Sequence, residues 1–474
     1  MPPDCPCLRY TGHFYSFRKG EISNVKAIVD WNASQSPRLF PSGLPAFSDR
    51  LGLPLQLYTP FWSDEYPTKY RMVESTTFKG TKLVTPNDSY PFFADLLDKG
   101  KRMTNGRFST YEIDFLDLNF QGSAAMTEDV YAAERWYSGM ARAADERRIA
   151  IQYCLPSATD MLVSLPYPSV VQARASGDYV STEENVEQLG GSSLLMGAVG
   201  IAPSKDTLWT RSPQPPTYSD IKQHNDYTTQ PHVALDAVLA TLSLGPVGIS
   251  DGLGQTDVVL ISQAFRCATD STLLRPSRPL STIDSVFFNR SVGQPSADVR
   301  ATHSTVAEAT THLLVAWRTK VPVALQPTDL YPAPSGTAQT RLAMRRHVLM
   351  PSDAHFFGCE DGHPAVPSCV HVLPQGGLPV LPATGGEDAN FSLTAVYESL
   401  SNGAFFLGEL NKFVPTALQR FESVRVSPGG ACGIALVVKG AVDEVIRIAA
   451  VDPGGTVRLA SVTIPNVGHV ELLM

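Results

Sequence analysis

The chain has 474 residues, a formal net charge of −8, and a composition that is 43% hydrophobic and 18% charged. This length exceeds what one hydrophobic core usually organises, so two or three domains are expected. The composition is that of a folded globular protein, and its acidity disfavours a nucleic-acid-binding protein, which needs a basic surface against phosphates. Because no apolar run reaches the roughly 20 residues of a membrane span, we expect neither nucleic acid nor a membrane as a partner.

The seven cysteines are scattered along the chain. Cys5 and Cys7 stand too close together for ordinary zinc spacing and lack a C-x-x-C partner, so we predict neither a metal nor another cofactor. Cys359 and Cys369 fit a small disulfide-closed loop or two unpaired thiols about equally well. The N-terminus lacks the apolar segment of a signal peptide, which leaves the compartment open. Four N-x-[ST] sequons hint weakly at secretion, at Asn32, Asn87, Asn289 and Asn390.

Short apolar runs alternate with amphipathic or loop segments over about the first 280 residues. Eight of them read as strands, at residues 13–17, 25–31, 53–61, 111–118, 148–154, 169–175, 206–210 and 245–250. Strands that alternate with helices predict right-handed crossovers and a parallel sheet. Eight strands in this length predict a (β/α)8 TIM barrel over residues 1–280. A doubly wound open sheet is the competing architecture, but the chain shows no glycine-rich phosphate loop after an early strand.

Two stretches between these runs have the apolar period of a helix. In residues 127–148, Val130 opens the apolar face and Thr127 is the predicted N-cap. Residues 231–245 form the second helical stretch, with Gly245 just past its end.

After about residue 280 the pattern changes to short β-branched runs separated by turn signals such as SPGG and DPGG. Five such runs lie at residues 421–426, 432–440, 444–452, 456–464 and 469–474. They predict an antiparallel β-sandwich within a C-terminal β-rich domain that covers residues 281–474. The stretch 320–400 is rich in Pro and Gly and is expected to form long loops around further strands.

The stretch YEIDFLDLNF, residues 111–120, places three carboxylates in a segment that otherwise reads as a buried strand. Side chains alternate along a strand, so Glu112 and Asp114 share one side, while Asp117 falls on the other side or in the following loop. A carboxylate that points into a barrel is costly unless it is hydrogen-bonded or paired, so its presence suggests use. A salt bridge at a strand end is the structural alternative, with about equal weight.

A second stretch, VVQARASGDYV at residues 170–180, runs from a buried strand into a tight turn. Arg174 is suited to hold a carboxylate in a bidentate pair, and Asp178 is expected to project from the loop at the strand end. Two acids that face one cavity from neighbouring strands suit glycoside hydrolysis, where one attacks the anomeric carbon and the other protonates the leaving oxygen. Taken alone, RASGD also fits an ordinary surface turn.

These stretches resemble the α-galactosidase and raffinose-synthase group, glycoside hydrolase family 36 and its relatives. YEIDFLD is similar to the group's fourth barrel strand, and RASGD is similar to its Arg-x-Ser-x-Asp loop after strand six. Further segments resemble the group in the same order, at residues 40–44, 203–210, 242–254 and 273–284. The resemblance covers roughly residues 10–285, in pieces that are each short.

The resemblance implies a retaining glycosidase that acts on terminal α-galactosides, including raffinose-type oligosaccharides. Asp114 would be the nucleophile that forms a covalent glycosyl ester, and Asp178 would be the general acid/base. Arg174 would contact the substrate or orient the acid. Because the acid must keep its proton near neutral pH, burial or the neighbouring negative charge is expected to raise its pKa.

Five further residues are candidates for substrate binding. Trp62 and Trp209 are suited to stack on sugar faces, although packing is the commoner role of such rings. Lys205 and Asp206 either hydrogen-bond sugar hydroxyls or pair with each other on a loop. Asp251, at the end of the predicted eighth strand, either contacts the substrate or closes a turn.

The chain departs from the group in three features. Glu112 stands where many relatives carry a lysine, and its charge disfavours the ionised form of Asp114 unless something compensates it. The first predicted strand offers no acid for sugar hydroxyls. The group's large N-terminal β-sandwich is also missing, as expected of a compact lineage or an incomplete gene model.

Other functions remain open on these residues. A catalytically silent carbohydrate-binding barrel and a transglycosylating raffinose-synthase-like enzyme are the main alternatives. A lyase or aldolase is disfavoured, because no predicted strand ends in a lysine suited to a Schiff base and no His/Asp/Glu cluster has metal spacing.

Overall fold

The structure, a computed structural model, describes the chain in segments. They are residues 9–12, 15–16, 22–23, 26–30, 40–63, 66–76, 81–117, 122–177, 183–205, 207–212, 232–252, 254–267, 270–288, 298–317, 319–333, 342–349, 370–373, 380–381 and 391–474. The chain divides into two compact units. The N-terminal unit comprises Met1–Ala175, Leu195–Pro203 and Ile221–Gln223, and the C-terminal unit comprises Ser176–Leu194, Ser204–Asp220 and His224–Met474. The predicted domain boundary near residue 280 stays a prediction.

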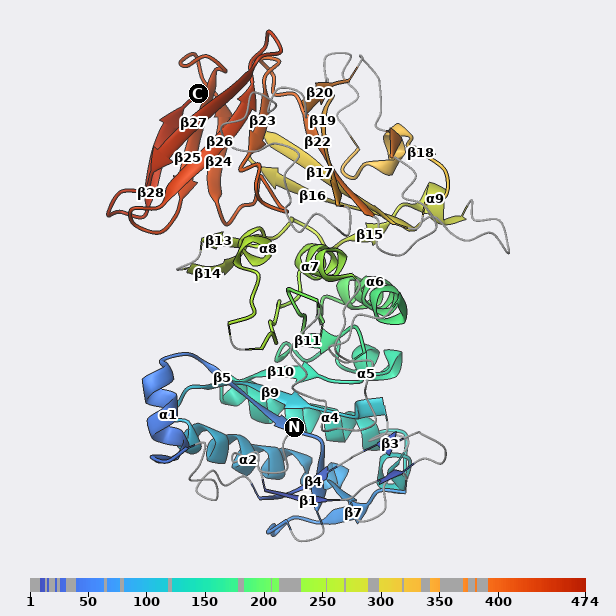
Figure 1. The fold of residues 1–474 in the computed structure, drawn as a ribbon. Coiled ribbons are helices and arrows are strands. Elements are labelled where there is room, and N and C mark those ends of the chain that lie inside the picture. Colours follow the sequence, from blue (N-terminus) through green and yellow to red (C-terminus); the bar gives the residue numbers. More distant parts are fainter. Residues whose placement is uncertain are drawn as a thin grey trace. The chain divides into compact units, whose positions relative to one another are not determined.

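The main sheet of the N-terminal unit has five strands in the order β12-β11-β10-β9-β5 (Figure 1). Its strands are β5 (Leu55–Thr59), β9 (Phe108–Ile113), β10 (Ala150–Tyr153), β11 (Val170–Arg174) and β12 (Ala202–Ser204). Neighbours from β5 to β11 pair in parallel. Four strands predicted from the sequence are thereby confirmed, and the molecule is a mixed α/β protein, as the alternation of strands and helices predicts.

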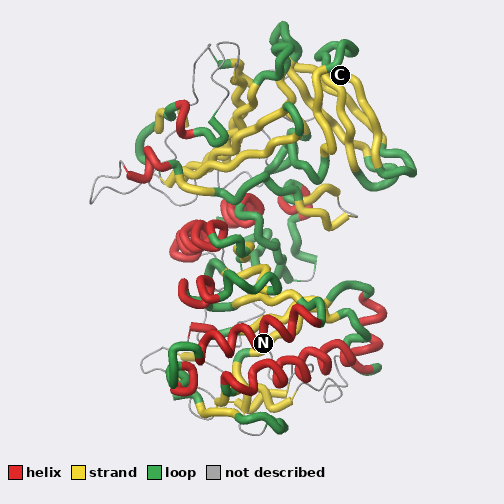
Figure 2. The backbone as a smooth tube through the Cα atoms, turned by 180° about the vertical axis from the view of Figure 1, so that it is seen from behind, coloured by secondary structure: helices red, strands yellow, loops and turns green. Residues whose placement is uncertain are grey.

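Two helices cover one face of this sheet. α2 (Ser89–Met103) precedes β9 and α4 (Ala132–Glu146) precedes β10, and the two helices lie side by side (Figures 1 and 2). Aromatic rings fill the contact, with centroids 5.9 Å apart for Phe93 and Tyr111 and 6.3 Å apart for Tyr137 and Tyr153. Alternation therefore turns Tyr111 and Ile113 of β9 toward the helices and Thr110 and Glu112 away from them, while Phe108, ahead of an irregularity in the β5–β9 register, also lies against α2.

A second sheet in the N-terminal unit has the strand order β1-β4-β6-β8-β7. Its strands are β1 (Arg9–Gly12), β4 (Lys26–Asp30), β6 (Phe61–Ser63), β7 (Met72–Glu74) and β8 (Thr81–Val84). β6 follows β5 after one residue, Pro60, and pairs in parallel with β4, so the chain passes from one sheet to the other here. Shorter elements are β2 (Tyr15–Ser16), β3 (Ile22–Ser23), α1 (Gly43–Leu51), η2 (Pro86–Asp88), η3 (Ala124–Met126) and α5 (Ala158–Val163).

The first predicted helix begins later than expected. α4 starts at Ala132, Val130 is 88% exposed, and Thr127 does not cap the helix. The cause is local, because the Asp129 carboxylate accepts the N–H of Tyr131 at 2.7 Å and fixes a turn ahead of the first helical residue.

The C-terminal unit carries the remaining helices and is β-rich from β15 onward (Figure 2). The earlier elements are α6 (Glu183–Ala198), which extends across the boundary between the units, α7 (Val233–Leu242), α8 (Val258–Ser262), β13 (Phe265–Cys267) and β14 (Asp270–Leu273). α7 confirms the second predicted helix. The predicted strands 206–210 and 245–250 reduce to one parallel bridge between Leu208 and Ile249, and β12 forms earlier in the chain instead.

An antiparallel sheet of six strands follows, in the order β15-β16-β17-β22-β19-β20. Its strands are β15 (Ser281–Thr282), β16 (Asp298–Val306), β17 (Ala309–Trp317), β19 (Leu342–Leu349), β20 (Val370–Val372) and β22 (Phe391–Glu398). Nearby lie α9 (Asp284–Phe288), β18 (Val323–Ala324), η4 (Pro327–Asp329) and β21 (Val380–Leu381).

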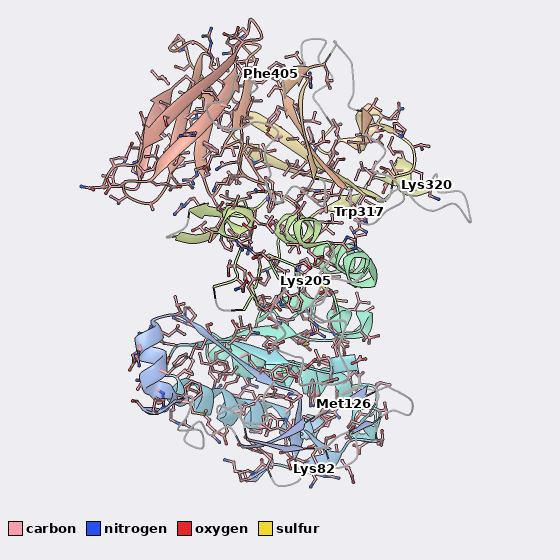
Figure 3. The ribbon with its side chains drawn as sticks, in the orientation of Figure 1. Lys82, Met126, Lys205, Trp317, Lys320 and Phe405 are labelled. Carbon is pink, nitrogen blue, oxygen red and sulfur yellow. The ribbon has the colours of Figure 1, made fainter. Side chains whose placement is uncertain are left out.

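The five runs predicted near the end of the chain are all strands. They are β24 (Phe421–Val426), β25 (Ile434–Lys439), β26 (Val445–Val451), β27 (Val457–Thr463) and β28 (His469–Leu473), which with β23 (Phe405–Gly408) form two antiparallel sheets of three strands. One apolar cluster joins both sheets, and within it the rings of Phe406 and Phe421 meet edge to face at 4.9 Å. Trp317 and Phe405, labelled in Figure 3, are both buried. Among the helices of the described segments, none combines the length and the apolar character needed to cross a bilayer.

Candidate active site

The face of the parallel sheet that is turned away from α2 and α4 is polar. The register places Tyr58, Glu112, Gln152 and Gln172 side by side in one row across β5, β9, β10 and β11. Two residues further along each strand, the same face presents Asp114, Cys154 and Arg174 at the carboxyl ends of the strands. Glu112 and Asp114 therefore share one face, as the alternation predicts.

Glu112 lies at the centre of a chain of amide hydrogen bonds. Gln56 Nε2 donates to its Oε2 at 2.6 Å, and Gln152 Nε2 donates to its Oε1 at 3.2 Å. Gln172 Nε2 in turn donates to the side-chain carbonyl of Gln152. The negative charge of Glu112, for which the sequence suggested no compensating group, is thus stabilised by amide dipoles from the strands on both sides of β9.

Asp114 is buried, with 7% of its surface exposed, and both of its carboxylate oxygens accept hydrogen bonds. The Tyr58 hydroxyl donates to Oδ2 at 2.5 Å, and the N–H of Phe115 donates to Oδ1 at 2.7 Å. Its own N–H donates to the carbonyl of Thr59 at 2.9 Å, which extends the β5–β9 pairing by one residue. These contacts fix the orientation of a carboxylate at a strand end.

Strained backbone follows both central strands of the site. Phe115 has φ of 56° and Leu155 has φ of 48°, a left-handed conformation that costs about 1–3 kcal/mol for a residue other than glycine. The two turns are bonded to each other, because the N–H of Asp117 donates to the carbonyl of Leu155 at 3.2 Å. Asp117 therefore lies past the end of β9, where the backbone has become helical, and not on the strand face shared with Ile113. Such strain is concentrated at functional sites in proteins.

Cys154 and Arg174 complete the described part of the site. Burial raises the pKa of the Cys154 thiol, the charge of Asp114 raises it further, and the Arg174 guanidinium opposes both effects. Arg174 is itself 9% exposed. The structure thus brings together Asp114 and Arg174, two of the predicted site residues, with Cys154 between their strands.

Trp62 is packed inside the N-terminal unit. Its ring is 4% exposed, lies 4.4 Å from the ring of Tyr66 and meets Phe92 edge to face at 5.2 Å. These surroundings fit a packing role for Trp62, the alternative to sugar stacking that the sequence left open.

Lys205 is a buried residue of the C-terminal unit and directly follows β12 (Figure 3). Its Nζ lies 3.7 Å from Oδ2 of Asp236 on α7 and donates to the carbonyl of Thr207 at 2.8 Å. None of the predicted strands ends in a lysine, but the unpredicted strand at Ala202–Ser204 places Lys205 just past a strand end. An ion-paired ammonium is a poor nucleophile, so a Schiff-base role remains disfavoured.

Trp209 and Asp251 also belong to the C-terminal unit. Trp209 is 4% exposed and adjoins the bridge between Leu208 and Ile249. Asp251 accepts the N–H of Thr210 at 2.8 Å and the Thr210 hydroxyl at 2.5 Å. These bonds tie together the two segments that the bridge joins, a role in the local fold that the sequence left open for Asp251.

Asp178 and Asp206 lie outside the described residues, as do Cys359, Cys369 and three sequon asparagines, Asn32, Asn289 and Asn390. The fourth, Asn87, is an exposed residue of η2. Within the described ranges, His, Cys, Asp and Glu side chains nowhere gather in threes or more in a way that would hold a metal ion.

Several residues of the site were not predicted as site residues from the sequence. Tyr58, Cys154 and the three glutamines lie in segments that were predicted as strands, but only the register between the strands brings them to Glu112 and Asp114. A usable signal was the polar residue at alternate positions of otherwise apolar runs, as in LPLQLYTPF and RIAIQYC.

Two surface cavities of the N-terminal unit lie elsewhere. One, of about 470 Å³, includes Tyr90, Arg142 and Tyr167 in its lining, and the other, of about 540 Å³, includes Tyr66, Tyr70 and Arg102. Neither lining includes a residue of the cluster around Asp114.

The comparisons with known proteins add no family. No family model matches the chain, and no curated protein matches its sequence. The fold and the site therefore define the class on their own: a mixed α/β protein with a hydrogen-bonded, buried carboxylate at the carboxyl edge of a parallel sheet.

Proposed function

We propose that the protein is a retaining glycoside hydrolase that acts on terminal α-galactosides, including raffinose-type oligosaccharides. In this proposal the parallel strands belong to a (β/α)8 barrel, whose reactions take place at the carboxyl ends of the strands. The β-rich region after about residue 280 is the accompanying C-terminal domain, with the sandwich architecture that the sequence predicts.

The observation that carries the proposal is the environment of Asp114. It is a buried carboxylate at the end of β9, oriented by the Tyr58 hydroxyl and the Phe115 N–H, beside a strained turn. Burying a charge costs stability unless it is hydrogen-bonded, and local strain adds to that cost. A side chain needed only to close a strand end would not require either, so a chemical role accounts for the arrangement better.

The proposed reaction proceeds in two displacements. Asp114 attacks the anomeric carbon and forms a glycosyl ester, while Asp178 gives a proton to the leaving oxygen; Asp178 then takes a proton from water, which attacks the ester and releases the sugar. In retaining enzymes the two carboxyl groups lie about 5–5.5 Å apart, and this is the separation expected for Asp114 and Asp178. Arg174 is placed in this scheme as the residue that orients the acid or contacts the sugar.

Hydrolysis of an aryl α-galactoside by the wild type, Asp114→Asn and Asp178→Asn proteins tests the proposal. Asp114→Asn should lower kcat/KM by about three orders of magnitude or more, because the amide cannot form the ester. Asp145→Asn, which changes an exposed acid on α4, is the matched control and should leave turnover unchanged.

The outcomes separate the alternatives. Turnover that survives both site substitutions would eliminate these residue assignments. A wild-type protein that binds galactose without turnover would favour a silent carbohydrate-binding barrel. If an added oligosaccharide acceptor diverts the galactosyl group from water, the transglycosylating alternative is the correct one.

A further inference from the structure

A cavity of about 470 Å³ lies in the N-terminal unit, apart from the candidate active site, and has no role in the scheme above. Its volume falls within the range of small-molecule sites in proteins. Three segments form its walls: the junction of η2 and α2 with Asn87 and Tyr90, one face of α4 with Ser138 and Arg142, and the loop of residues 166–169 before β11.

Close contacts between the walls fix the shape of this cavity. A Cβ atom on Gly139, in the lining, would lie 2.7 Å from the Ser89 hydroxyl oxygen, so α4 lies directly against the start of α2. The Ser89 hydroxyl donates to the carbonyl of Trp136 at 2.6 Å, and the Ser169 hydroxyl donates to the carbonyl of Ala141 at 3.1 Å. Both bonds are buried, and each joins another wall to α4. The cavity is therefore built by the fold itself, as ligand sites usually are.

Two tyrosine rings stand in different walls of the cavity. The hydroxyl of Tyr90 donates to Glu146 at 2.6 Å, and the guanidinium carbon of Arg142 lies 4.2 Å from the centre of the Tyr90 ring. Tyr167, in the opposite segment of the chain, is half-buried and has an exposed proline on each side in the sequence. A fixed tyrosine ring offers apolar contact area at little cost in conformational entropy. These walls favour a ligand with apolar faces.

The arginines of the lining are already paired with acids. The Arg135 guanidinium donates to both oxygens of Asp129, at 3.2 Å and 2.7 Å, and Nε of Arg142 donates to Glu146 at 3.0 Å. Opposite charges in contact largely cancel each other's field, so an anion gains little attraction from either pair. The cavity is therefore not suited to select an anionic ligand.

Polar groups at the cavity are suited to bind hydroxyls. Asn87 is exposed, and within the described segments its amide has no hydrogen-bond partner, so it offers a ligand both a donor and an acceptor. The side chain of Arg142 stays 66% exposed beside Tyr90. A wholly apolar ligand would cover these groups and leave them unpaired, which costs free energy. Apolar faces combined with hydroxyls that donate and accept are the chemistry of a neutral saccharide.

We infer that this cavity is an accessory saccharide site, in which Tyr90 and Tyr167 pack against a sugar while Asn87 and Arg142 bind its hydroxyls. The site holds an oligosaccharide and takes no part in bond cleavage. The preference for a neutral saccharide follows from the cavity alone, whereas the choice of an α-galactoside as its ligand rests on the proposed function.

Hydrogen exchange followed by mass spectrometry locates the bound sugar. The probe is raffinose and the protein is the full chain with Asp114→Asn, which blocks turnover in the proposed scheme. Raffinose should slow exchange in residues 134–146 and 164–170, which include the α4 and loop walls of the cavity. The raffinose concentration that gives half of this protection measures the affinity of the cavity itself, separately from any binding at the candidate active site.

Two variants of the lining test the assignment. Tyr167→Ala should raise the half-protecting concentration about tenfold through the lost ring contact. Asn87→Ala should raise it about threefold through the lost hydrogen bonds, and because Asn87 is exposed this variant keeps the fold. Tyr131→Ala, at a 63% exposed tyrosine outside the lining, is the matched control and should change nothing. Thermal unfolding verifies that each variant is folded.

The outcomes separate this inference from the proposed function. If raffinose protects the cavity in a protein that never hydrolyses an α-galactoside, the inference holds and the hydrolase proposal fails. If raffinose leaves the cavity unprotected, or if the three variants have equal affinity, the accessory site is overturned while the hydrolase proposal stands on its own turnover assay. Protection of the cavity by a proline-rich peptide and not by raffinose would make it a peptide site and also overturn the inference.

Discussion

Both units of the molecule bury charged side chains, but they neutralise them differently. In the C-terminal unit, Arg420 is fully buried and its guanidinium pairs with Glu409 at 2.7 Å and with Glu444 at 2.6 Å. It also donates to the carbonyl of Lys439 at 2.7 Å. Lys412 is buried nearby and donates to the carbonyls of Ser262 and Phe265. Two cations and two anions therefore balance.

On the polar face of the parallel sheet, the described hydrogen bonds to the two acids come from neutral donors. Glu112 accepts hydrogen bonds from two side-chain amides, and Asp114 accepts hydrogen bonds from a tyrosine hydroxyl and a backbone N–H. A balanced cluster that joins several loops serves the fold. The carboxylates of the parallel sheet lie instead beside strained turns at strand ends, where proteins concentrate function, and this position supports placing the proposed function at Asp114.

The largest expected effect comes from breaking the balanced cluster. Arg420→Met should lower the free energy of unfolding by about 3–5 kcal/mol, because the buried Glu409 and the partly buried Glu444 would both lose their partner. Urea denaturation measures the loss. The control is Arg458→Met, whose side chain is 50% exposed and pairs with Asp452, and which should cost at most about 1 kcal/mol. Equal losses from the two variants would remove the distinction between the two kinds of charge.

A smaller loss is expected on the packed side of the parallel sheet. A Cβ atom on Gly139 of α4 would lie 2.7 Å from the Ser89 hydroxyl oxygen and 2.7 Å from the backbone nitrogen of Tyr90. Gly139→Ala should therefore cost about 1–3 kcal/mol through overpacking. Gly191→Ala on α6 meets nothing within 4 Å and should instead stabilise by up to about 1 kcal/mol. Thermal unfolding of both variants checks the opposite signs.

The smallest expected effect is the response of the C-terminal unit to acid. Burial lowers the pKa of His303 from its ordinary value of 6.5, and His312 and Arg278 lower it further, while Glu398 opposes them. The unfolded chain then binds more protons, so the stability from neutral His303 is present above pH 6.5 and is lost as pH falls toward the folded-state pKa.

His303→Gln should flatten the decline in unfolding free energy between pH 7 and acid, as followed by urea denaturation across that range. His469→Gln, at an exposed position of β28, is the control. A steeper decline in His303→Gln than in the wild type would contradict the expected direction of the pKa shift.

Much of the fold can be predicted from the sequence, because binary patterns are local. The alternation in IALVVK matches the burial of Ile434, Leu436 and Val438 on one face of β25. The first residue of α4 is harder to predict. The turn fixed by the Asp129 carboxylate competes with helix formation, and the spacing of apolar residues carries no information about that turn. β12 is hard to predict for a similar reason, since Ala-Pro-Ser has little β propensity and pairing with β11 decides its state.

In the candidate site too, features set within one strand can be predicted from the sequence, and features set by pairing between strands cannot. That Glu112 and Asp114 share a face follows from alternation in one strand and needs no partner. That Tyr58 bonds Asp114, and that Gln56 and Gln152 bond Glu112, depends on register between strands distant in sequence, which no single run of residues encodes. The carboxylates are therefore predictable from the sequence, and the groups that orient them are not.

The most direct test of the account is chemical labelling of the ester that Asp114 is proposed to form. A fluorinated α-galactosyl fluoride slows release of the sugar, and mass spectrometry of the digested protein locates the attached group. The account predicts one added galactosyl unit on the peptide that contains Asp114, absent from Asp114→Asn. Turnover of α-galactosides with the label on a different acid, or with no label at all, would contradict it.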